Sequence, residues 1–331
     1  MTGPGTAPAT EPPYVRTGSA ATDASTSMTS LATADLAPAD RPTGAAPPST
    51  VNRGRPWMQI PYWIVLLFWA AVFMYPFLWL LSASFKTRAN VFDNKVIPDP
   101  FTTANYGEVW HVAPLLRWLA NSGYIGLFAA TTVTFSSALV AFGFAYFRFP
   151  GRNVLFGTVL GSMMLPGLVT MIPVFLIWKN VGLNDTQVPL WAGNLFGSAF
   201  YIFLLRQFFL ALPRELFEAA RVDGCSYLGL FWRIAVPLSK PALIIVFIFE
   251  FQASWDDLLK PLIYLGNKTE LYTVPLGLNS LYVKFNPIAG GEGDFQYIVT
   301  AALLATLPMI LIFLFGQRYF VEGIATQARK G

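Results

Sequence analysis

The sequence predicts an all-α integral membrane protein with six spanning helices. Of its 331 residues, 54% are hydrophobic and only 12% are charged, and the mean hydropathy is +0.50. Soluble domains carry about 25% charged residues, so this composition indicates that lipid is the main solvent of the chain. Several uncharged runs also reach the roughly 20 residues that a helix needs to cross a bilayer.

The predicted spans follow the order of these apolar runs. Five of them rest on charge-free stretches, whereas the fifth in chain order is interrupted by acids and a lysine. Prolines within the runs predict kinks, and small side chains in the second span permit close packing between helices. The spans cover residues 60–82, 120–147, 154–178, 187–209, 241–265 and 296–318, and the small residues are Ala129, Ala130, Ser136, Ser137, Ala138 and Ala141.

Two regions differ sharply in composition. Residues 1–55 are rich in Ala, Ser, Thr and Pro and are predicted to form a disordered cytoplasmic tail, because they have too little apolar surface to offset the entropy of ordering. Residues 56–331 form the predicted transmembrane domain. Arg53 and Arg55 directly before the first span favour a cytoplasmic N-terminus, and six spans then place both termini in the cytoplasm of a multi-pass protein of the cell (inner) membrane.

Several chemistries find no support in the sequence. The phosphate-binding pattern G-x-x-x-x-G-K-S/T is absent, so we do not expect this chain to bind or hydrolyse ATP. A single cysteine, Cys225, excludes an internal disulfide and a cysteine-based zinc site. His111 is the only histidine. We therefore predict no catalytic residues, no metal site and no bound cofactor.

Residues 213–240 form the longest polar interruption that still predicts ordered helix. Pro213 suits a first helical position, and Asp223-Gly224 supplies the stop, because glycine adopts the left-handed conformation without steric cost. Ser226 is expected to cap a second helix, which Pro237 is expected to end. The apolar face of the first helix carries Leu216, Phe217 and Ala220. Two short amphipathic helices between spans indicate a docking element for another molecule.

This segment resembles the cytoplasmic loop signature of ATP-binding-cassette importer permeases. The matching residues are Glu218-Ala219-Ala220, Gly224 after three further residues, Ile234 nine residues later, and Val236-Pro237, where leucine usually precedes the proline. Other stretches are similar to the carbohydrate branch, specifically the maltose-type second permease subunit: residues 145–152, 164–166, 182–186 and 317–323. The resemblance covers about residues 60–331. It implies a six-helix type I importer permease bundle with cytoplasmic coupling helices.

The resemblance also implies a function and a set of partners. The chain is expected to be the transmembrane permease subunit of a binding-protein-dependent, ATP-driven carbohydrate importer, and not an enzyme. Expected partners are a second permease in a heterodimer, two cytoplasmic ATPase subunits that carry ATP and Mg, an extracellular substrate-binding lipoprotein, and the sugar. No nucleic acid is expected. The implied ATPase-coupling residues are Glu218, Ala219, Ala220, Arg221, Asp223, Gly224, Ile234 and Pro237; for Glu218, a local pair with Arg221 is the alternative.

The interrupted fifth span supplies candidate residues for the substrate pathway. Ionisable groups within a span are costly and face a bundle interior or a wet cavity. Glu250 falls near mid-membrane, and Trp255, Asp256 and Asp257 fall near the outer side, where an aromatic face and carboxylates suit a sugar. The alternative is an Asp256–Lys260 ion pair with Trp255 as an interface anchor. The family usually has Trp-Asn-Asp here and a Trp-Pro pair three residues on, so Asp256 and Lys260 are departures from its pattern.

The outer loop 266–294 and two other functions complete the sequence-based predictions. Tyr272, Thr273 and Pro275 lie in a stretch similar to the family's external loop that meets the binding protein; packing of this loop on its own helices is the alternative. A second possible function is a proton-coupled secondary transporter half-bundle that uses the acids of the fifth span. A third is an intramembrane hydrolase with paired acids at Asp256 and Asp257, but neighbouring helical residues point about 100° apart.

Overall fold

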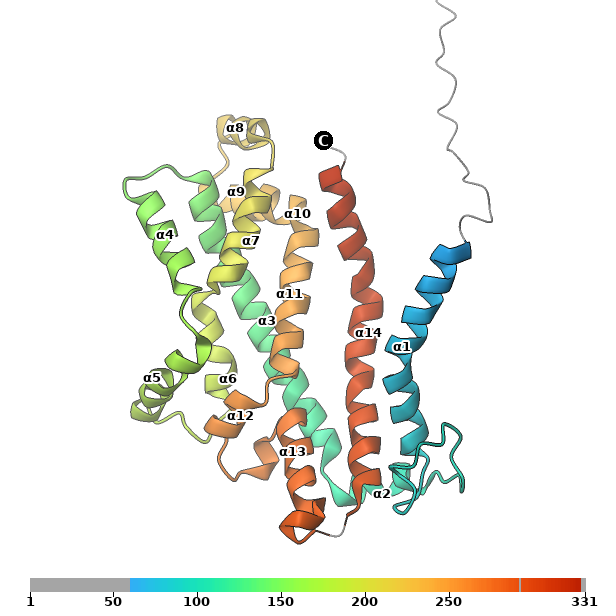
Figure 1. The fold of residues 1–331 in the computed structure, drawn as a ribbon. Helices are drawn as coiled ribbons and strands as arrows, with labels where there is room; N and C mark the ends of the chain where they lie inside the picture. The colour runs from blue at the N-terminus through green and yellow to red at the C-terminus, as the bar shows by residue number, and fades with distance from the viewer. Residues whose placement is uncertain (1–59, 292, 329–331) are drawn as a thin grey trace, which may run out of the picture. The chain divides into compact units, whose positions relative to one another are not determined.

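The computed structural model describes residues 60–291 and 293–328, and every regular element in these residues is a helix (Figure 1). The all-α prediction is therefore confirmed for this part of the chain. The predicted disordered tail, residues 1–55, lies outside the described residues. The contacts discussed below lie within the compact unit Pro61–Gly331.

Three long unbroken helices and three bent pairs make up the membrane part of the described chain. The unbroken helices are α1 (Ile60–Ser84), α3 (Leu115–Tyr146) and α14 (Phe295–Ala328). The bent pairs are α4 (Arg152–Ser162) with α5 (Gly167–Asn180) at 98°, α6 (Val188–Ala192) and η2 (Gly193–Phe196) with α7 (Ala199–Leu210) at 40°, and Tyr227–Leu238 with α11 (Lys240–Trp255) at 80°. By length and composition, these give three membrane crossings, or up to six if each bent pair is one span.

Shorter helices lie between these elements and at the two ends of the bundle. They are α2 (Ala104–Val112), α8 (Arg214–Val222), α9 (Tyr227–Leu230), the π-helical η3 (Phe231–Ala235), α10 (Val236–Leu238), α12 (Leu259–Tyr264), η4 (Thr269–Leu271), α13 (Val274–Phe285) and η5 (Pro287–Ala289). In Figure 1, α8 lies at one end of the bundle, with α9 and α10 close by, and the C-terminal end of α14 points toward the same end. Helices α2, α12 and α13 lie toward the opposite end.

Helix α3 is central to the packing, since α7 and α11 both lie against it along much of its length. The close approach depends on small side chains, as the sequence predicted. A Cβ added to Gly126 would lie 3.1 Å from the ring of Phe251 on α11. Ser136 donates a hydrogen bond to the Asn194 carbonyl across the α3–η2 contact. The predicted small residues Ala129, Ala130, Ser137, Ala138 and Ala141 are all buried.

Predicted spans 154–178, 187–209 and 241–265 are each divided into shorter helices, and the first divides at a proline, as the prolines in the apolar runs predicted. Pro166 has extended backbone (φ −61°, ψ 130°) directly before α5, because proline cannot continue the preceding helical hydrogen bonds. Gly197 has φ +79°, a left-handed conformation that separates η2 from α7. In the third case α11 ends at Trp255, and the Asp257 carboxylate accepts a hydrogen bond from the Lys260 backbone N–H as α12 begins.

The last turn of α1 is fixed by a small polar network around a buried lysine. Lys86 is 0% exposed and donates to the Asp93 carboxylate and to the Asp93 and Lys95 carbonyls. Asn105 of α2 donates to the carbonyls of Ser84 and Lys86. Most other side chains of α1 are exposed and apolar. This network therefore attaches α1 to the rest of the bundle mainly at the end that lies near α2.

Candidate functional site

The polar segment 213–240 folds as two helical pieces joined at a sharp bend. Gly224 has φ +82°, so the predicted glycine stop after α8 is confirmed. The Ser226 hydroxyl accepts a hydrogen bond of 3.1 Å from the Gly229 N–H, which confirms the predicted cap of the second helix. Pro213 precedes the first helical residue instead of occupying that position. Pro237 is the next-to-last residue of the helical run Tyr227–Leu238, so the second helix ends one residue after the predicted stop, at the 80° bend into α11.

One aromatic side chain anchors α8 to the bundle. Phe217 is 5% exposed, and its ring centroid lies 5.6 Å from that of Tyr146 and 6.2 Å from that of Phe142, both on α3. Phe142 also lies 5.5 Å from Phe231 of η3. The apolar face predicted for α8 is thus used to hold the helix on the end of α3. Leu216, placed on the same face from the sequence, is instead 46% exposed.

The opposite side of this segment is open. The exposed residues are Glu218, Ala219, Arg221, Asp223, Gly224 and Pro237. Ala220 and Ile234 are half-buried. Val222 is 88% exposed, which is unusual for a valine held in an ordered helix. The predicted coupling residues therefore form an exposed, partly apolar surface at one end of the bundle.

Arg221 stabilises the bend and does not pair with Glu218. Its guanidinium donates a 2.8 Å hydrogen bond to the Cys225 carbonyl and lies 4.2 Å from the ring centroid of Tyr227. No ion pair within the described residues includes Glu218. The local Glu218–Arg221 pair predicted as an alternative is therefore absent from this structure.

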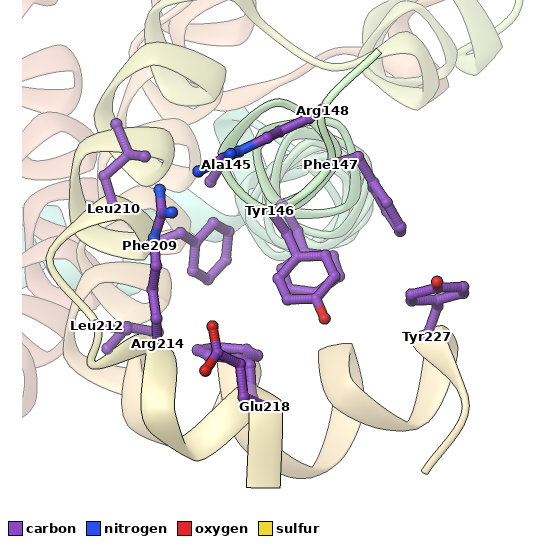
Figure 2. Close-up of a pocket in the computed structure, with 12 residues that line it drawn as sticks. Ala145, Tyr146, Phe147, Arg148, Phe209, Leu210, Leu212, Arg214, Glu218 and Tyr227 are labelled. Carbon is purple, nitrogen blue, oxygen red and sulfur yellow. The ribbon is translucent and has the colours of Figure 1, made fainter. Parts of the chain in front are cut away.

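A cavity of about 490 Å³ separates α8 from the ends of α3 and α7. Its walls are aromatic, with Phe142, Tyr146 and Phe217 among them, and its polar groups include Arg214 and Glu218. Figure 2 shows the Glu218 carboxylate and the Tyr146 hydroxyl directed into this space. Phe217 therefore borders this cavity and also packs on Phe142 and Tyr146 of α3.

Glu250, the acid predicted at mid-membrane, is engaged inside the bundle. Asn194 of η2 donates a 2.5 Å hydrogen bond to its carboxylate, and the Tyr201 hydroxyl of α7 also interacts with it. The Asn194 amide lies 3.4 Å from the Ala129 carbonyl of α3 as well. Glu250 thus connects α11 to the break between η2 and α7. Sequence reasoning missed Asn194 and Tyr201; the signal available was a polar side chain between Gly193 and Gly197 in an otherwise apolar run.

The other predicted pathway residues have different surroundings. Trp255 is 6% exposed and stacks on Phe251 at 5.8 Å, so its ring packs within the bundle and is not open to a pathway in this structure. Lys260 pairs with Asp257 at 3.3 Å, and the Asp256–Lys260 pair predicted as an alternative is wrong. Asp256 itself is exposed. The next residue, Asp257, is held by both the side chain and the backbone N–H of Lys260.

Asp257 and Lys260 line a second cavity of about 500 Å³ between α5, α6, η2 and α12. Most of its wall is apolar, and its remaining polar or aromatic side chains include Asn194, Trp178 and Tyr264. Asn194 therefore contacts Glu250 and also borders the cavity. A mostly apolar cavity with a few polar groups on different elements is the usual form of a small-molecule site.

The stretch predicted to meet a binding protein packs against its own bundle. Tyr272 is 9% exposed and Thr273 is 1% exposed, while Pro275 is half-buried. Asn121 of α3 donates to the Tyr272 carbonyl at 3.0 Å, and the Val274 N–H donates to the Ser122 hydroxyl at 2.8 Å. Tyr272 and Thr273 therefore agree with the alternative prediction, in which this loop packs on its own helices. The neighbouring residues 268–270 are exposed.

The described residues contain no cluster of side chains that could bind a metal ion. No three His, Cys, Asp or Glu side chains come together there. Cys225 is a free thiol, half-buried at the bend after α8.

Comparison with known proteins identifies the family. Residues 125–326 match the family described as the binding-protein-dependent transport system inner membrane component. The chain belongs to this family. It is 33% identical over 265 residues to the arabinooligosaccharides transport system permease protein AraQ of Bacillus subtilis (strain 168), which covers 78% of this chain and 92% of that protein. It is 34% identical over 284 residues to the osmoprotective compounds uptake permease protein GgtD of Synechocystis sp. (83% and 93%).

Solved structures agree with this assignment at the level of the fold. A chain of a bacterial ABC transporter involved in the import of the acidic polysaccharide alginate has a TM-score of 0.70 and 24% sequence identity; the match covers 81% of this chain and 98% of that chain. The predicted type I importer permease fold is thereby confirmed. Members of this family are transport subunits, so the predicted intramembrane hydrolase and the proton-driven half-bundle are both set aside in favour of an importer permease.

Proposed function

We propose that this permease carries carbohydrate across the cell membrane as one half of a permease heterodimer. Two cytoplasmic ATPase subunits, which bind ATP and Mg, drive the pair, and an extracellular binding protein delivers the sugar. The carbohydrate class is supported by relatives named for arabinooligosaccharides and alginate. Both termini are taken to be cytoplasmic, which agrees with the excess of arginine and lysine around α8.

The observation that carries this proposal is the form of the α8 segment. An exposed helix with Ala219 and Val222 on its surface ends in a left-handed glycine, and a single buried aromatic residue holds it to α3. A short helix with small and apolar surface residues suits a groove on a partner protein. When ATP closes the two ATPases, the α8 helices of the two permeases are drawn together. The bundle then opens its cavity outward.

The substrate pathway follows from the cavity that Asp257 and Lys260 line. Polar groups there are supplied by α12 and η2, and aromatic side chains by α5 and α12. The hydroxyl groups of a sugar match the hydrogen-bonding side chains, and the C–H groups of its ring match the aromatic faces. Glu250 is assigned a structural role, because Asn194 occupies its carboxylate. Motion of η2 relative to α11 would then change the cavity and the Asn194–Glu250 contact together.

Gly224 provides a direct test of the coupling segment. A side chain at φ +82° is strained, although the space around a Cβ at this position is open. Leucine at Gly224 should distort the bend and abolish binding-protein-stimulated ATP hydrolysis in the reconstituted complex. Asparagine tolerates the left-handed conformation much better, so Gly224→Asn should retain most of this activity.

The two Gly224 variants must be compared at equal levels of membrane insertion. Full stimulated hydrolysis and sugar uptake by Gly224→Leu would contradict the proposal. Equal loss in Gly224→Leu and Gly224→Asn would also count against it, because the effect would then not depend on the backbone conformation of the bend.

A further inference from the structure

Four arginines gather where α3, α4, α7 and α8 meet, and the proposed coupling function does not use them. Arg148 and Arg152 flank the turn between α3 and α4, Arg206 lies in the last turns of α7, and Arg214 begins α8. We call these four residues the arginine cluster. Arg152 and Arg206 are close enough for their positive charges to repel one another.

Two members of the arginine cluster are held in position by the end of α3. Arg152 donates to the Phe147 carbonyl at 3.3 Å, and Arg206 donates to the Phe144 carbonyl at 3.4 Å. The Arg206 guanidinium also lies 4.2 Å from the ring centroid of Phe156. A guanidinium has five N–H donors, and each described hydrogen bond uses one of them. Arg152 and Arg206 are therefore positioned in advance, and the hydrogen bonds described here leave most of their N–H donors for another acceptor.

No carboxylate within the described residues forms an ion pair with the arginine cluster. Glu218 is the acid that shares the 490 Å³ cavity beside α8 with Arg148 and Arg214, and Figure 2 shows those two arginines extending toward the same side of that cavity. A smaller cavity of about 380 Å³ in the α3–α4 turn contains no acid. Its lining consists of Arg148, Phe149, Gly151, Arg152, Asn153 and Val154.

The residues beside this smaller cavity indicate which anion it accepts. Val154 is 74% exposed, Leu155 is 53% exposed and Phe149 is 39% exposed. No side chain of helix α4 is fully buried within the chain, and together with α5 the helix is apolar enough to cross a membrane. Arginines directly beside exposed apolar side chains at the end of a membrane helix match a phospholipid, whose phosphate adjoins its acyl chains. Basic pockets of this kind bind anionic headgroups.

We propose that Arg148 and Arg152 bind the phosphate of an anionic phospholipid in the α3–α4 turn, with the acyl chains along α4. Arg206 adds positive charge beside the site. The bound lipid neutralises charges that otherwise repel one another next to α8. This site binds a membrane lipid and not the transported substrate, so lipid binding is independent of which sugar is carried.

Lipid titration of the purified full-length chain, followed by native mass spectrometry, tests this proposal. The probes are phosphatidylglycerol, phosphatidylcholine and free inorganic phosphate. We expect selective retention of phosphatidylglycerol, and an affinity about thirtyfold lower in Arg148→Gln/Arg152→Gln, since two charges are lost. Arg233→Gln/Lys240→Gln removes two exposed charges near α10 and should change the affinity by less than about twofold. Arg148→Gln alone, at an exposed side chain, gives a smaller loss and avoids any effect on folding.

Several results would overturn the lipid site. Equal retention of the two lipids, or equal loss in the two double variants, would show only general charge attraction. Displacement of phosphatidylglycerol by inorganic phosphate at the same concentration would show a site for free phosphate. If the arginine variant keeps its lipid but no longer co-purifies with the ATPase subunits, these arginines are protein contacts and the assignment is wrong.

Discussion

Replacing Phe217 by alanine removes the contact that joins α8 to the membrane helices. The ring is 5% exposed and lies 5.6 Å from Tyr146 and 6.2 Å from Phe142. Truncation of a buried phenylalanine costs about 3–5 kcal/mol. Because a cavity of about 490 Å³ already borders the ring, we expect the lower end of this range. A loss of about 3 kcal/mol lowers the ratio of docked to undocked α8 by about 150-fold.

Hydrogen–deuterium exchange of the full-length protein in detergent measures this ratio directly. In Phe217→Ala, the amides of α8 should exchange about 150-fold faster if local opening governs their exchange. Amides in the middle of α3 and α11 should not change, and sugar uptake should be lost although the protein remains inserted. Leu216→Ala is the matched control, because this neighbouring side chain is 46% exposed and contributes little to docking.

Unchanged exchange in α8 of the Phe217→Ala protein would refute the reasoning, since α8 would then be held by contacts other than this ring. Accelerated exchange along the whole of α3 would also refute it. In that case Phe217 would stabilise the bundle as a whole instead of one helix at its end.

Two further predictions concern acidic residues with identified partners. Glu250→Leu removes the charged acceptor of the half-buried Asn194 amide, so the free energy of unfolding should fall by about 1.5–3 kcal/mol. Glu250→Gln keeps an acceptor oxygen and should retain sugar uptake; loss of uptake in Glu250→Gln alone would instead indicate a role for the charge. Hydrogen bonding from Lys86 holds the pKa of Asp93 below its usual range, so this carboxylate stabilises the fold above about pH 4 and the contribution is lost as pH falls through its lowered folded-state pKa. Melting temperatures of wild type and Asp93→Asn should therefore differ at neutral pH and converge in acid, and a constant difference at every pH would contradict this assignment.

The features that the sequence predicted well are those set by local chemistry. Composition and charge-free runs predict the membrane helices, because removing a charged side chain from water is costly wherever it occurs. Gly224 and Ser226 were assigned correctly, since a left-handed glycine and a serine cap act through neighbouring backbone groups. The small residues of α3 predicted close packing between helices, and the structure shows α7 and α11 as the helices that lie against it.

The features that the sequence did not predict depend on residues far apart in the chain. The Asn194–Glu250 hydrogen bond joins residues separated by 56 positions, and neither residue indicates the other. Tyr272 and Thr273 were assigned to an outer surface by a family pattern, but α3 covers them in the folded chain. Lys260 had two acids within reach along the helix, and the break after Trp255 brought Asp257 rather than Asp256 to it.

The central claim is that α8 contacts a nucleotide-hydrolysing partner, and site-specific photo-cross-linking tests it most directly. A photoreactive residue at Ala219, which is exposed on α8, should form a cross-link to an ATPase subunit in intact membranes, with a yield that changes when ATP is added. The same probe at Glu270, which is exposed in η4 between α12 and α13, should form none. Cross-links from Ala219 only to other parts of this chain or its permease partner, with or without ATP, would contradict the account.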